Sequence, residues 1–117
     1  MAASDVVHQY LAASGRRDFE AARQLLADDL DFKGPIDTFH RADDYLLAIR
    51  RLAAIVQEVR VQKEFVDGDD VCLIYDLVTN TPAGTAPVAE WFRVRAGKIA
   101  QIRVFFDARP FAPPAGH

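Results

Sequence analysis

The sequence has 117 residues, a length that suits one compact domain over residues 1–117. Half of the residues are hydrophobic and 26% are charged, and the net charge of −3 gives no electrostatic case for a nucleic-acid partner. No apolar run approaches the roughly 20 residues of a membrane span, and the N-terminus lacks the charged and apolar regions of a signal peptide. We therefore expect a cytoplasmic protein that binds neither nucleic acid nor membranes.

Two residue types that often carry chemistry are sparse in this chain. Cys72 is the single cysteine, so it cannot form an internal disulfide, and its apolar neighbours predict a small core residue rather than a nucleophile. His8, His40 and His117 show no metal-ligand spacing with Cys72 or with one another. We therefore predict no metal site and no cofactor.

Helical spacing predicts two helices at the start of the chain. Ser4 or Asp5 can cap the first, and Gly15 is expected to end it. Tyr10 falls on the apolar stripe of this helix, where a tyrosine is either a core residue with a satisfied hydroxyl or part of a pocket. Asp18 is expected to cap the second helix.

A short strand is predicted after the second helix, around Phe32, and Gly34-Pro35 is expected to break it. A loop that contains Asp37 and His40 leads to the longest helix, predicted over about residues 42–57. The buried stripe of this helix is expected to consist of Tyr45, Leu46, Ile49, Leu52, Ala53 and Val56.

From Glu58 onward the apolar residues recur with period two, which predicts strands. Turn signals at residues 67–70 and 81–84 separate them, and residues 87–107 read as a hairpin with a tight connection at residues 96–98. Helices followed by four long antiparallel strands predict an α+β fold, in which three N-terminal helices pack on one face of a curved sheet.

The apolar faces of the hairpin match if Phe92 lies opposite Ile102 and Glu90 opposite Val104. This register predicts a three-residue loop in which Gly97 takes positive φ. It also places the Glu90 carboxyl on an apolar face, where it must be paired, hydrogen-bonded or protonated.

Two interpretations of Glu90 stay open. Desolvation can raise its pKa and make it a tuned acid–base group. Alternatively, Arg103 on a neighbouring strand or a buried tyrosine satisfies it structurally.

The order of these elements resembles the nuclear transport factor 2-like superfamily over nearly the whole chain. The resemblance implies a cone, in which helices close a bent antiparallel sheet around a deep apolar pocket, and it implies frequent homodimers that pair through sheet faces. The segments that carry it are Val6-Val-His-Gln-Tyr-Leu-Ala-Ala13, Ala27-Asp-Asp29, Glu90-Trp-Phe-Arg-Val94 and Arg103-Val-Phe-Phe106.

Within this superfamily the chain resembles the ketosteroid isomerase type, which uses a first-helix tyrosine and a protonated carboxylic acid as an oxyanion hole and an aspartate as general base. Tyr10 and Glu90 stand at the matching tyrosine and acid positions, but Gly34 stands where the base is expected. Polyketide cyclases of the SnoaL type and limonene-epoxide-hydrolase-like enzymes place carboxylates on late strands. Asp107 is therefore one candidate base, although it can also pair with Arg109, and Asp37, three residues after Gly34, is the other.

The resemblance implies a cofactor-independent enzyme of the isomerase, cyclase or hydrolase type that acts on a small hydrophobic ligand. The alternative is a non-catalytic ligand-binding or dimeric assembly module of the same fold. Trp91 and Phe105 fall on the arginine-bearing sheet face and suggest a homodimer surface. The residues expected to bind the substrate are Phe32, Tyr75, Phe92, Val104 and Phe106.

Overall fold

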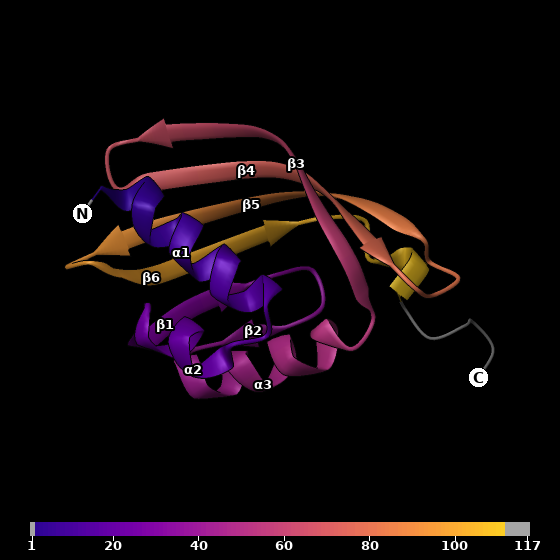
Figure 1. Cartoon of the computed structure of the whole chain (residues 1–117), viewed down its shortest axis with the longest axis horizontal. Coiled ribbons are helices and arrows are strands. Elements are labelled where there is room, and N and C mark those ends of the chain that lie inside the picture. The colour runs from indigo at the N-terminus through magenta and orange to yellow at the C-terminus, as the bar shows by residue number, and fades with distance from the viewer. Residues whose placement is uncertain (1, 112–117) are drawn as a thin grey trace.

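The computed structural model describes residues 2–111 and forms an α+β fold, as predicted (Figure 1). The helices are α1 (Ala3–Gly15), α2 (Phe19–Gln24), α3 (Ala42–Ala53) and the 3₁₀-helix η1 (Arg109–Phe111). The strands are β1 (Leu26–Lys33), β2 (Thr38–Phe39), β3 (Val56–Asp67), β4 (Asp70–Thr79), β5 (Thr85–Arg95) and β6 (Lys98–Phe105). They form one sheet in the order β2-β1-β6-β5-β4-β3, in which β1 and β6 are parallel and the other neighbours antiparallel.

The predicted helix boundaries hold in part. Asp18 caps α2 as expected, and its carboxylate accepts a hydrogen bond from the backbone N–H of Ala21. The first helix begins earlier than predicted, because Ala2 is its N-cap and Asp5 lies inside the first turn, where its carboxylate accepts from the Ala2 N–H. The helix predicted to be the longest, α3, ends at Ala53 rather than near residue 57, because the chain enters β3 at Val56. With 12 residues it is shorter than α1, which has 13, so that part of the prediction is wrong.

The predicted register of the β5–β6 hairpin is confirmed, with Phe92 opposite Ile102 and Glu90 opposite Val104. The prediction of a three-residue loop in this hairpin is wrong. Ala96 and Gly97 form a two-residue turn with φ of 52° and 76°, values that suit the type I′ turns preferred in hairpins. The extra residue is Ala100 on β6, which lies in a bulge between the pairs Arg93–Gln101 and Val94–Ile99, because a bulge absorbs one residue without moving the pairs beyond it.

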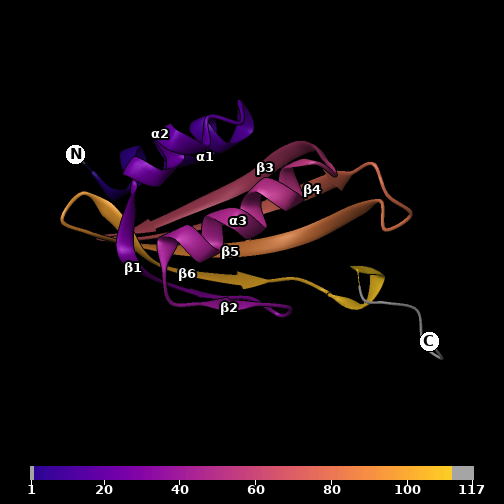
Figure 2. The same ribbon diagram turned by 90° about the horizontal axis from the view of Figure 1, so that it is seen from below.

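The three α-helices lie on one face of the curved sheet (Figures 1 and 2). The first, α1, packs across β4, β5 and β6, and the core forms between them. In contrast, α3 packs mainly against β1 and β2 at the sheet edge. It therefore stands off the central strands and leaves room for a cavity. None of the helices formed by residues 2–111 is long and apolar enough to cross a membrane.

Candidate functional site

A cavity of about 870 Å³ opens between α3 and the sheet. Its volume falls within the range of roughly 300–1,000 Å³ that is usual for small-molecule sites. Of the residues expected to bind a substrate, the structure places Phe32, Tyr75, Val104 and Phe106 in the wall. Phe92 is fully buried and does not line the cavity, since its ring packs edge-on against Tyr10 in the core behind it.

The alternation of β5 carries Glu90 to the inner face of the sheet, on the cavity wall, and leaves the residue only 7% exposed. The hydroxyl of Tyr75 on β4 donates a 2.7 Å hydrogen bond to Glu90 Oε1. Oε2 makes no hydrogen bond with residues 2–111. It is also not fully buried, so it is the oxygen that remains available to a ligand. Burial raises the pKa of Glu90 to about 7, against a smaller lowering by the Tyr75 hydrogen bond.

The structure thus decides between the two partners proposed for Glu90. Tyr75 is the partner, whereas the Arg103 guanidinium lies 2.9 Å from the Asp31 carboxylate. Because burial and the nearby Glu90 carboxyl raise the pKa of Tyr75, this residue is a phenol and a donor at neutral pH.

Two further phenols lie beside Glu90. The hydroxyls of Tyr10 on α1 and Tyr45 on α3 are hydrogen-bonded to each other. Tyr45 lines the cavity, but Tyr10 does not, so Tyr10 reaches the site only through Tyr45. Burial is the main cause that raises the pKa of both phenols, and Glu90 adds to it. The buried polar part of the wall therefore consists of Glu90, Tyr75 and Tyr45. The exposed charged residues Asp37, Asp44 and Arg51 also line the cavity.

Sequence reasoning placed Tyr45 on a buried stripe and gave it no chemical role. Its hydroxyl was the available signal, because a buried tyrosine normally needs a hydrogen-bond partner. The spacing along the chain does not identify that partner, since Tyr10 lies 35 residues away.

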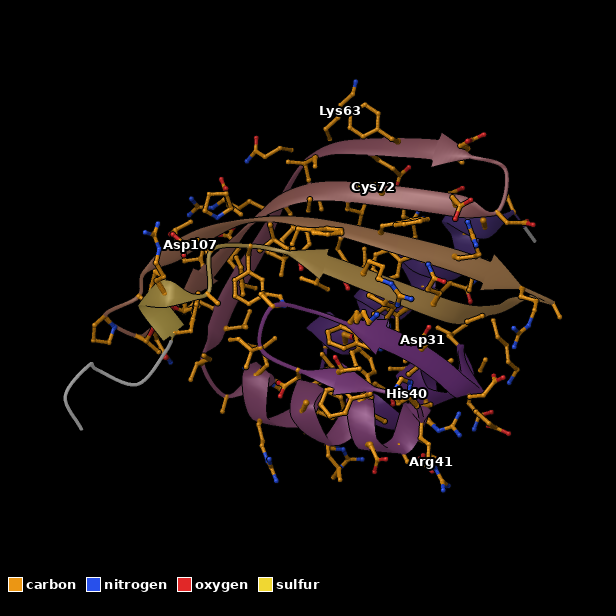
Figure 3. The ribbon with its side chains drawn as sticks, turned by 180° about the vertical axis from the view of Figure 1, so that it is seen from behind. Asp31, His40, Arg41, Lys63, Cys72 and Asp107 are labelled. Atoms are coloured by element: carbon orange, nitrogen blue, oxygen red, sulfur yellow. The ribbon has the colours of Figure 1, made fainter. Side chains whose placement is uncertain are left out.

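The structure places Asp107 outside the cavity wall. It follows β6 on the surface, beside η1 (Figure 3). Its carboxylate accepts hydrogen bonds from the backbone and guanidinium of Arg109, which hold its pKa at about 2. This arrangement matches the ion-pair alternative weighed for Asp107, and it leaves the carboxylate far less basic than Glu90.

The loop after β1 borders the mouth of the cavity. Gly34 and Asp37 both line it, and the Gly34 N–H donates to the Asp37 carbonyl. A side chain at position 34 would place its Cβ 3.3 Å from the ring of Phe32. The Gly34 backbone therefore already lies close to this ring of the wall. His40 lies near Asp31 with 3.6 Å between Nδ1 and Oδ1, and it is not among the lining residues (Figure 3).

No group of three or more metal-ligating side chains occurs within residues 2–111, and His117 lies outside them. The wall carries the carboxyl groups of Glu90, Asp37 and Asp44 together with phenols, and these carboxyl groups do not form such a group. What it can do is exchange protons and hydrogen bonds with an apolar molecule.

The fold agrees with that of known proteins. A protein from Kribbella flavida has 31% identity and a TM-score of 0.84 over 92% of this chain and 88% of its own. An NTF2-like protein of unknown function from Cytophaga hutchinsonii has 28% identity and a TM-score of 0.83 over 95% of both chains. Structures described as an epoxide hydrolase, a putative polyketide cyclase and a putative ketosteroid isomerase share the fold alone, at 18–24% identity.

No curated protein matches the sequence. A family model does: the SnoaL-like domain matches residues 7–102, which include the helices α2 and α3, most of the sheet and every polar residue of the cavity wall described above. The chain therefore belongs to the SnoaL-like domain family, within the NTF2-like superfamily.

Proposed function

We propose that this protein is a cofactor-independent enzyme that moves a proton on a small hydrophobic carbonyl compound, with Glu90 as the proton carrier. The position of Glu90 carries the proposal: a buried carboxyl on the wall of an apolar cavity, with Oε2 left for a ligand. Because its pKa is about 7, both the acid and the base form are populated at neutral pH, as proton-transfer catalysis requires.

The proposed step begins with ionised Glu90. Oε2 takes a proton from the carbon next to the carbonyl, and the electron pair of that C–H bond moves toward the carbonyl oxygen. The developing negative charge needs a donor in a dry site, and the Tyr45 hydroxyl lines the cavity for that role. Tyr10 supports Tyr45 from behind, and Tyr75 holds Oε1. Return of the proton to a different carbon makes the reaction an isomerisation.

One carboxyl group serves as both acid and base in this scheme. Asp107 is engaged by Arg109 outside the cavity, and Gly34 supplies no side chain. Asp37 borders the mouth with an exposed side chain and is the alternative base. The same shortage of bases favours the second candidate function, a non-catalytic module that binds a hydrophobic ligand.

Exchange of carbon-bound protons for deuterium tests the reaction class without knowledge of the natural substrate. β-Tetralone, a hydrophobic ketone with acidic α-protons, is incubated with the protein in deuterium oxide and followed by proton NMR. We expect wild-type protein to accelerate the exchange, and Glu90→Gln to lower that acceleration roughly 100-fold or more. Asp29→Asn, which removes an exposed carboxylate outside the cavity wall, is the matched acid-to-amide control and should stay close to wild type.

The pH profile adds a second criterion, since a base with a pKa of about 7 makes the exchange rate rise up to that pH and level off above it. Equal rates in wild type and Glu90→Gln contradict the proposal. Tight binding of β-naphthol without exchange supports the non-catalytic module instead.

We also propose a homodimer through the sheet face opposite the helices. Phe105 on β6 is 59% exposed there, and Phe65 on the edge strand β3 is similarly exposed. Within residues 2–111 no helix covers this face (Figure 2). Exposed aromatic side chains are typical of protein interfaces. Sedimentation should show a dimer that Phe105→Glu converts to a monomer; a strictly monomeric wild type contradicts this proposal.

A further inference from the structure

The chain leaves the sheet at one end of the cavity and turns back to line it. On β6, Val104 lies opposite Glu90, and the residues beyond it lead away from Glu90 toward η1. Phe106 and Phe111 both line the cavity, one before this turn and one at its end. In Figures 1 and 2, η1 lies beyond the end of β6, at the end of the sheet remote from the β5–β6 turn.

The turn from Asp107 to Phe111 is held by its own side chains. The Asp107 carboxylate accepts from the Arg109 backbone N–H at 3.0 Å and from its guanidinium at 2.7–3.1 Å. The Phe111 N–H donates to the Ala108 carbonyl, and Pro110 restricts the backbone between them. The Phe111 ring meets the Phe106 ring edge-on, with 5.7 Å between centroids.

We propose that Phe111 is the end wall of the cavity and limits the length of ligand that the site admits, and that Asp107 and Arg109 are positioning residues that hold this wall. The inference rests on the proposed function in one respect, because it takes the same cavity as the ligand site. It gives Asp107 a role that requires no contact with the ligand.

The physical basis is the loss of apolar contact at the wall. Each methylene group that a ligand buries in the cavity raises its affinity roughly fourfold. A chain that reaches Phe111 must stop, bend or displace the ring from Phe106, so further methylene groups bring little gain. The Arg109 side chain is 90% exposed, and exposed ion pairs are weak. The ion pair between Asp107 and Arg109 therefore acts by fixing the geometry of the turn, and its loss lets the Phe111 ring move.

A series of para-alkylphenols, from para-ethylphenol to para-octylphenol, tests the wall by calorimetric titration. The phenol is expected at Glu90 and Tyr45, with the alkyl chain directed along the cavity. Wild-type affinity should rise with chain length and then level off. In Phe111→Ala the levelling should move to longer chains, by about the length of the ring that is removed. In Asp107→Asn it should move in the same direction by less.

Two controls separate positioning from general damage. Asp29→Asn removes a similarly exposed ion pair, 3.1 Å from Arg95 and outside the cavity wall, and should leave the profile unchanged. The affinity for para-ethylphenol should be the same in every variant, because this ligand is too short to reach the turn. Thermal unfolding identifies any variant that fails to fold.

An identical chain-length profile in wild type and Phe111→Ala overturns the inference, as does the absence of binding by every phenol. If the profiles are identical but short phenols still bind, and bind only when Glu90 is present, the proposed ligand site stands. A shifted profile in a protein that never accelerates α-proton exchange upholds the end wall while the enzymatic function fails.

Discussion

Replacing Glu90 by Gln should stabilise the protein at alkaline pH, and the size of the effect follows from the burial of this carboxyl. Its pKa rises from the ordinary value of 4.5 to about 7 on folding, chiefly because burial disfavours the charged form. Between these two values the folded protein holds a proton that the unfolded chain has released. Stability therefore falls as pH rises, by about 1.4 kcal/mol per pH unit. The total penalty above pH 7 is about 3 kcal/mol.

Glutamine is neutral at every pH, has nearly the same shape and still offers an oxygen to the Tyr75 hydroxyl. The free energies of unfolding of Glu90→Gln and wild type should therefore be similar below about pH 4.5. Above pH 7 the variant should be more stable by about 3 kcal/mol. Urea unfolding at steps between about pH 4 and pH 9 measures this difference, and subtraction removes the contributions of all other groups.

Asp107→Asn is a control of opposite sign. The hydrogen bonds from Arg109 lower the pKa of Asp107 to about 2, so its contribution to stability is present above the ordinary aspartate pKa and is lost only as pH falls toward 2. Its difference from wild type should be constant over the same pH range. A constant difference for Glu90→Gln as well would refute the claim that Glu90 is buried with a raised pKa.

Three further predictions concern the neighbours of Glu90 and the hairpin turn. Tyr75→Phe removes the hydrogen bond that lowers the pKa of Glu90, so the pH midpoint of α-proton exchange should move above its wild-type value of about 7; an unchanged midpoint contradicts this role. Tyr10→Phe leaves the buried Tyr45 hydroxyl without its partner and should lower the free energy of unfolding by about 1–3 kcal/mol in urea, whereas a neutral effect would mean that the pair is not formed. Ala96→Asn should raise it by roughly 0.5–1 kcal/mol, because asparagine tolerates the φ of 52° better than alanine; destabilisation would refute the assigned turn.

Local patterns carried much of the fold. Asp18 was recognisable as a cap because a carboxylate at that position satisfies a free helix N–H. Period-two alternation was enough to place Glu90 opposite Val104, since a shift of one residue would turn every apolar side chain outward. The bulge after Arg93 escaped prediction because it leaves those pairs unchanged and alters only the count of residues in the turn.

For the candidate site, the sequence predicted properties of individual residues but not the contacts between them. Alternation alone marked Glu90 as a carboxyl on an apolar face, whereas the apolar pocket was expected only from the resemblance to the superfamily. Which hydroxyl meets Glu90, that Tyr45 rather than Tyr10 faces the cavity, and that Asp107 turns toward Arg109 all depend on contacts made in the folded chain. Period and capping are set by neighbours along the backbone, so a sequence states them directly. Partners such as Tyr10 and Tyr45 meet only when separate elements pack, and packing is decided by the shape of the whole core.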